Sequence, residues 1–142
     1  MSLKLTIEPE CVVLIIDDDR DDQELLEEAL HEINVAIVCY KAGNGQEGMK
    51  LLLSGNIPMP EIIFVDLNMP RVNGRQFLHQ IKDNKILQNI PVIVYSTSYD
   101  EHESNDLISA GAAHFLKKPT NYEELKTKLE PVIERFRCNK VH

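Results

Sequence analysis

The sequence is poor in the features that mark secreted, membrane-bound or nucleic-acid-binding proteins. It has three cysteines, Cys11, Cys39 and Cys138, which are far apart, odd in number and without Cys-x-x-Cys spacing. That pattern argues against a disulfide framework or a zinc site, and we expect reduced thiols. The first residues, MSLKLTIEPE, contain no apolar signal segment. No later apolar run approaches the ~20 residues that a membrane span needs. We therefore expect a cytoplasmic protein without a membrane partner.

A basic excess is also lacking. The formal net charge is -8, which argues against nucleic acid as a partner. The five histidines are scattered without an i, i+4 pair, and we expect surface or partly packed side chains rather than metal ligands. No internal repeat, low-complexity tract or Ser/Gly linker divides the chain. We therefore assign residues 1–142 to a single domain, with its core at about 11–136 between short terminal extensions.

Short apolar segments alternate with helical patterns along the chain. Five runs rich in apolar or β-branched residues predict strands at Val12–Ile16, Ile37–Tyr40, Ile62–Val65, Val92–Tyr95 and His114–Leu116. Three of these runs are continuously apolar, as expected of strands covered on both faces. In the helical segments, Asn73 suits an N-cap and Gly111 suits the residue after a helix end. Pro131 lies inside the last helical pattern and predicts a kink or a restart there.

This alternation predicts a three-layer α/β domain with a parallel five-stranded sheet. In such a sheet the ligand crevice lies beyond the carboxyl ends of the strands. Four strands run into polar residues: Asp17-Asp18-Asp19, Asp66, Ser96-Thr97-Ser98 and Lys117-Lys118. The second strand is followed instead by a neutral, glycine-rich stretch. The strand order 2-1-3-4-5 makes the four polar ends neighbours and leaves the neutral end at the edge.

The aspartates at these strand ends would repel one another if all stayed ionised. A hard divalent cation relieves that repulsion, and Mg2+ binds one or two carboxylates while keeping water positions open for phosphate oxygens. A carboxylate beside Mg2+, a hydroxyl and a lysine together stabilise the charge that develops in phosphoryl transfer. We therefore predict a Mg2+ site at Asp17, Asp18 and Asp66, with Ser96 and Lys118 nearby.

The sequence resembles the receiver domain of two-component response regulators from about Cys11 to Phe136. The matching segments, in chain order, are VLIIDDD, IIFVDLNMPRVNG, IPVIVYSTS and GAAHFLKKP. Each segment alone is moderately specific, and their order and separations make the match strong. The resemblance implies a flavodoxin-like (βα)5 fold. The order 2-1-3-4-5 is found in this family too, so the agreement is not independent support.

By position, the resemblance implies roles for the acidic residues. Asp66 corresponds to the phosphoacceptor, which takes a phosphoryl group from a phosphohistidine of a sensor histidine kinase or a histidine phosphotransfer protein. Asp17 and Asp18 correspond to the acidic pair that holds Mg2+, together with Asp66 and the backbone carbonyl of Asn68. Asn68 also occupies a position that tunes self-dephosphorylation in the family.

The resemblance implies further roles at the ends of the last two strands. Ser96 stands where the family has a hydroxyl that bonds a phosphoryl oxygen, and Lys118 matches the lysine that pairs with the phosphoryl group. Phe115 holds the aromatic switch position, which is coupled to Ser96. Ser98, like Asn68, stands where the family tunes the phosphoryl lifetime.

The function implied is a phosphorylation-dependent signalling switch and not an enzyme, beyond self-catalysed phosphotransfer and dephosphorylation. After Phe136 the sequence continues only with RCNKVH, so we expect a stand-alone receiver that signals through an unknown downstream protein. We expect it to be a monomer or a phosphorylation-dependent dimer.

Three alternatives compete with this interpretation. A receiver-like module that has lost phosphorylation would act by binding alone. A haloacid-dehalogenase-type phosphatase uses an apolar strand followed by DxDx[TV], but Asp21 occupies the place of the Thr or Val. An EF-hand would use Asp17, Asp19 and Asp21, but it requires glycine where Asp22 stands.

Overall fold

The computed structural model describes residues 11–67, 73–97 and 100–136. In this part of the chain, strands and helices alternate from beginning to end. In chain order the elements are β1 (Cys11–Ile16), α1 (Arg20–Ile33), β2 (Ile37–Ala42), α2 (Gly45–Ser54), β3 (Ile62–Asp66), α3 (Gly74–Lys82), β4 (Val92–Ser96), α4 (Glu101–Ser109), β5 (His114–Lys117) and α5 (Tyr122–Phe136).

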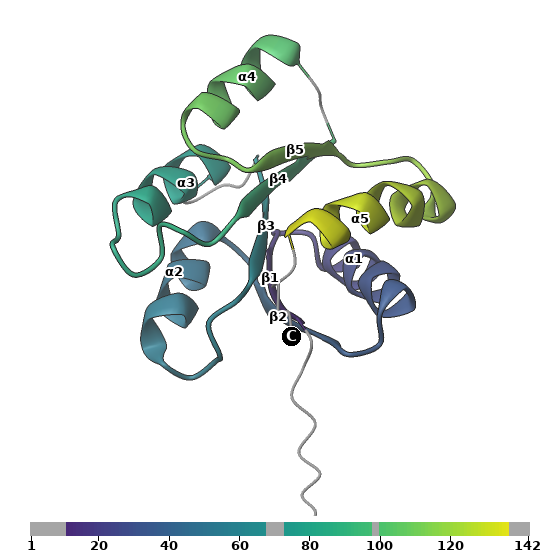
Figure 1. Cartoon of the computed structure of the whole chain (residues 1–142), viewed down its shortest axis with the longest axis horizontal. Coiled ribbons are helices and arrows are strands. Elements are labelled where there is room, and N and C mark those ends of the chain that lie inside the picture. The colour runs from purple at the N-terminus through teal and green to yellow at the C-terminus, as the bar shows by residue number, and fades with distance from the viewer. Residues whose placement is uncertain (1–10, 68–72, 98–99, 137–142) are drawn as a thin grey trace, which may run out of the picture.

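The strands form one parallel sheet in the order β2-β1-β3-β4-β5. Helices α1 and α5 lie on one side of the sheet, and α2 and α3 lie on the other (Figure 1). The predicted three-layer α/β fold and its strand order are therefore confirmed. Among the residues described, no helix is long and apolar enough to cross a bilayer.

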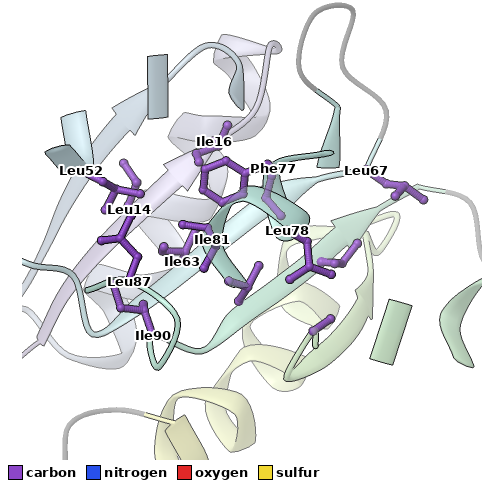
Figure 2. Close-up of a cluster of buried hydrophobic side chains, with 14 of the residues drawn as sticks. Leu14, Ile16, Leu52, Ile63, Leu67, Phe77, Leu78, Ile81, Leu87 and Ile90 are labelled. Carbon is purple, nitrogen blue, oxygen red and sulfur yellow. The ribbon is translucent and has the colours of Figure 1, made fainter. Parts of the chain in front are cut away.

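Alternation of side chains along each strand divides the core into two clusters. On β1, Leu14 and Ile16 face the helices α2 and α3, and their cluster is drawn in Figure 2. Val13 and Ile15, the residues between them in the sequence, face α1 and α5. Because both faces are covered, β1, β3 and β4 are buried along their whole length.

The helix ends follow the local sequence signals. The Asn73 side chain accepts a hydrogen bond from the Gln76 N–H, and the Gln76 side chain bonds back to Asn73, which forms a capping box. Gly111, after α4, has φ = 116°, a conformation that favours glycine. The expected restart at Pro131 is wrong, because α5 continues through it. Leu129, Val132 and Ile133 hold both halves of that helix against the sheet.

The two neighbouring leucines of α1 provide a test of how the core is held. Leu26 is fully buried, whereas Leu25 is 45% exposed. We expect Leu26→Ala to lower the free energy of unfolding by about 2–5 kcal/mol, because the substitution leaves a cavity in a packed core. Leu25→Ala, the control on the same helix, should change it by less than about 0.5 kcal/mol. Urea denaturation followed by circular dichroism measures both, and equal effects would contradict this packing.

Candidate functional site

The acidic rim of the sheet is built by the end of β1 and the start of α1. Asp17 directly follows β1 and is only 2% exposed. The residue that caps α1 is Asp19, whose side chain accepts hydrogen bonds from the N–H groups of Asp21 (2.9 Å) and Asp22 (3.3 Å). Asp17 and Asp18 are therefore not the residues that cap this helix.

Asp66 joins the two aspartates from the neighbouring strand. Ile16 on β1 is paired with Val65 on β3, so the chain positions that follow, Asp17 and Asp66, lie side by side. One carboxylate oxygen each from Asp17, Asp18 and Asp66 lies within 4.8 Å of the others. Asp17 and Asp66 are buried and Asp18 is exposed, so the cluster opens toward solvent at Asp18. Three such oxygens fit a hard divalent cation.

Lys118 crosses the sheet to reach the same cluster. Its Nζ lies 2.8 Å from Asp17 Oδ2, 2.9 Å from Asp22 Oδ2 and 3.5 Å from Asp66 Oδ2. Its backbone N–H donates to the Ser96 carbonyl at 2.7 Å, and its Nζ is 5.1 Å from the centre of the Tyr95 ring. The Lys118 ammonium thus compensates the negative charge of the rim.

The pKa of Lys118 reflects a balance of opposing effects. Burial lowers it, because a charged amine loses hydration. Hydrogen bonds to Asp17 and Asp22, and the charges of Asp17 and Asp66, raise the pKa by more than burial lowers it. The result is a pKa above that of an ordinary lysine, so the side chain stays protonated near neutral pH.

Strand alternation directs Ser96 and Phe115 to the other face of the sheet from Asp66. Ser96 is fully buried at the end of β4. Tyr95 before it belongs to the cluster under α1 and α5, so alternation directs Ser96 toward α3 and α4. Phe115 is half-buried and packs against the cluster that contains Leu14 and Ile16, on the side of α3. Because Phe115 pairs with Val94 and Lys117 pairs with Ser96, Phe115 and Ser96 are diagonal neighbours on one face.

The sequence model of the response regulator receiver domain matches residues 13–130. The chain belongs to this family. Receiver domains are phosphoacceptor signalling domains, generally not enzymes, which take phosphoryl groups from histidine kinases and bind Mg2+ in an acidic pocket.

Individual relatives agree with this assignment. The chain is 33% identical over 135 residues to response regulator Rcp1 of Synechocystis sp., with 90% of this chain and 89% of the relative covered. It is 32% identical over 118 residues to the probable C4-dicarboxylate response regulator DctR of Bacillus subtilis. That match covers 83% of this chain but spans only half the length of the Bacillus protein.

Solved receiver structures show the same architecture. The phosphorylated cyanobacterial phytochrome response regulator RcpA superposes with a TM-score of 0.81 at 27% identity, covering 89% of this chain and 94% of RcpA. The Mn2+-bound form of response regulator Rcp1 superposes with a TM-score of 0.79 at 29% identity, covering 93% of this chain and 97% of that one.

Two residues of this receiver domain that the sequence analysis did not select belong to the site. Asp22 is not among the predicted site residues, but its carboxylate accepts a hydrogen bond from Lys118. Gln23 is buried, and its Nε2 donates to the carbonyls of Asp17 (2.7 Å) and Ala42 (3.0 Å). It therefore ties the end of β1 to the end of β2. No sequence motif identifies Gln23. Asp22 could be identified only once Asp19 is known to cap α1, because the cap fixes which residues of the first turn face the site.

Gly74, the first residue of α3, fixes how closely this helix approaches Asp66. A Cβ atom added there would lie 2.8 Å from the Asp66 carbonyl oxygen and 2.8 Å from the Leu67 Cα. Both are backbone atoms and cannot turn away, so a side chain would push α3 off the strand end. Asn68 and Ser98, two positions named from the resemblance, lie outside the described residues.

Replacing Lys118 in the receiver domain tests its role in balancing the rim. In metal-free buffer, Lys118→Met should lower the free energy of unfolding by at least about 1 kcal/mol, because buried carboxylates lose their partner. Lys117→Met, at the exposed neighbouring position, should change it by less than about 0.5 kcal/mol. Urea unfolding with EDTA present measures both.

The same pair of variants has a defined pH dependence. Because folding raises the pKa of Lys118, its contribution is complete below the ordinary lysine value of about 10.4 and is lost as the pH rises through the higher folded value. The difference in unfolding free energy between wild type and Lys118→Met should therefore be constant near neutral pH and shrink only in alkaline buffer. A difference that already disappears at neutral pH would contradict the contacts described.

Proposed function

We propose that this chain is a phosphorylation-dependent switch of a two-component phosphorelay, with Asp66 as the phosphoacceptor. The observation that carries the proposal is the convergence of Asp17, Asp18 and Asp66 within 4.8 Å, with the Lys118 Nζ 3.5 Å from Asp66. These side chains come from three strand ends that are distant in sequence. Core packing alone does not require buried carboxylates at this edge.

The donor set fits Mg2+, a hard cation that prefers oxygen ligands and near-octahedral geometry. Asp17, Asp18 and Asp66 would hold it, with the backbone carbonyl of Asn68 as the additional protein ligand that the family resemblance suggests. When bound, Mg2+ neutralises charge on the phosphoryl oxygens. The Mn2+-bound form of Rcp1, a related receiver, supports a divalent ion in this kind of site.

The residues of the chain supply the rest of the chemistry. A carboxylate oxygen of Asp66 attacks the phosphorus of a phosphohistidine on the partner. The new P–O bond forms as the P–N bond breaks, and the imidazole leaves with the electron pair and takes up a proton. The Lys118 ammonium lies 3.5 Å from Asp66 and would pair with the added negative charge, which it stabilises by electrostatic attraction.

Phosphorylation would bias an equilibrium between two conformations. A phosphoryl group on Asp66 offers hydrogen bonds to the Ser96 hydroxyl and to Lys118, so the state that brings both inward is stabilised. Lys118 would then exchange Asp17 and Asp22 for the phosphoryl group. Phe115, the diagonal neighbour of Ser96, would move with it and alter the surface of α4 and β5.

We also propose a phosphodonor, a location and a mode of action for this receiver domain. The donor would be a sensor histidine kinase or a histidine phosphotransfer protein in the cytoplasm. The receiver domain would act on a downstream protein, as a monomer or as a dimer formed on phosphorylation. The related response regulator RcpA has been solved in a phosphorylated form, which supports the proposal that this chain is itself phosphorylated.

Acetyl phosphate with Mg2+ tests the acceptor. We expect the wild-type protein to gain the mass of one phosphoryl group, stable in acid and labile in base, as an acyl phosphate is. Asp66→Asn should abolish the gain, because an amide is not a comparable nucleophile. Asp83→Asn, at the exposed end of α3, should label like the wild type. Labelling of folded Asp66→Asn at the wild-type level would refute the assignment, and no labelling of the wild type would favour a module that acts by binding alone.

Calorimetric titration tests the metal ligands. We expect Asp18→Ala to weaken Mg2+ binding by at least about tenfold, because an oxygen ligand is lost. Asp21→Ala, in the exposed first turn of α1, should bind Mg2+ as the wild type does. Lys118→Met should bind Mg2+ more tightly, since a competing positive charge is removed. An Asp18→Ala titration that matches the wild type would count against this ligand set.

A further inference from the structure

A second group of metal-ligand side chains lies between α1 and the edge strand β2. One ligand atom each from Glu27, His31 and Cys39 lies within 4.8 Å of the other two. The group is separate from the acidic rim, because Cys39 pairs with Val13 in the middle of β1 rather than with its carboxyl end.

The fold itself brings these three residues together. Glu27 and His31 are four residues apart on α1, so they share one face of the helix. Cys39 packs against the cluster that α1 covers, so its side chain points to the same layer. Glu27 and Cys39 are half-buried and His31 is exposed, which leaves the group open to solvent on one side.

We propose that Glu27, His31 and Cys39 bind a divalent transition metal, with Zn2+ as the preferred ion. Thiolate, imidazole and carboxylate are the ligands of Zn2+, and three protein ligands with one open position make a common arrangement. Mg2+ prefers oxygen ligands alone. The two sites of this chain therefore select different metals by ligand chemistry.

One of the three proposed ligands already takes part in an ion pair. Lys41 Nζ lies 2.6 Å from Glu27 Oε1, but a carboxylate has a second oxygen, so Lys41 and a metal can share Glu27.

Binding at this place links two elements that pack side by side. The metal would join α1 to β2, the strand at one edge of the sheet. It would stabilise the folded chain by mass action, because the unfolded chain does not hold the three ligands together. Asp66 takes no part, so this site operates with or without phosphorylation.

Cobalt(II) titration of the full chain tests the proposal, since Co2+ replaces Zn2+ and absorbs in the near ultraviolet when a thiolate binds it. Cys138→Ser serves as the background, which removes the cysteine outside the described residues. We expect a thiolate-to-cobalt band that saturates at one equivalent and is displaced by Zn2+. The band should persist in Asp66→Asn, and this result would show that it does not arise from cobalt bound at the acidic rim. No band in the background protein, or loss of the band in Asp66→Asn, would overturn the proposal.

Ligand variants complete the test, with circular dichroism to establish that each one folds. Cys39→Ser should abolish the band, and His31→Ala and Glu27→Gln should weaken binding by at least about tenfold. His102→Ala, at an exposed helical histidine of α4, is the matched control and should bind like the background protein. Zn2+ should raise the melting temperature of the background and of His102→Ala by more than it raises that of His31→Ala. A band that survives Cys39→Ser, or equal affinity and melting behaviour in His31→Ala and His102→Ala, would refute the site.

Discussion

Crowded negative charge at one edge of the sheet is the constraint on which the rest of this structure depends. The fold meets it with Lys118, whose ammonium lies within 2.9 Å of oxygens of both Asp17 and Asp22. These contacts connect the end of β5 to the end of β1 and to the first turn of α1. The ammonium offsets part of the negative charge of the rim, and it is carried on a flexible side chain that another anion can recruit.

The parallel sheet makes this arrangement rigid. All five strands end at the same edge, and the two apolar clusters hold β1, β3 and β4 from both sides. Gly74 brings α3 against the backbone of Asp66, and Gln23 ties Asp17 to the end of β2. Backbone geometry and packing thus hold the carboxylates close together in spite of their mutual repulsion.

Much of this architecture could be predicted from the sequence. Apolar periods alternating between strand and helix predicted the fold, and the residues after each apolar run indicated where Asp17, Asp66 and Lys118 would meet. Asp22 and Gln23 were not predicted, because the direction of their side chains depends on which aspartate caps α1. The group of Glu27, His31 and Cys39 was not predicted, because contact between a helix and a strand leaves no fixed spacing in the sequence. The restart expected at Pro131 is wrong, because the packing of α5 against the sheet outweighs the local preference of proline for a break.

The alternation of side chains has a consequence for how a modified Asp66 is sensed. Asp66 and Lys118 lie toward α1 and α5, whereas Ser96 and Phe115 lie toward α3 and α4. A group attached at the end of β3 would stand at the boundary of the two layers, with one potential reporter in each. A single covalent event could thereby be transmitted to opposite flanks of the molecule at once, and a mutation that silences one flank need not silence the other.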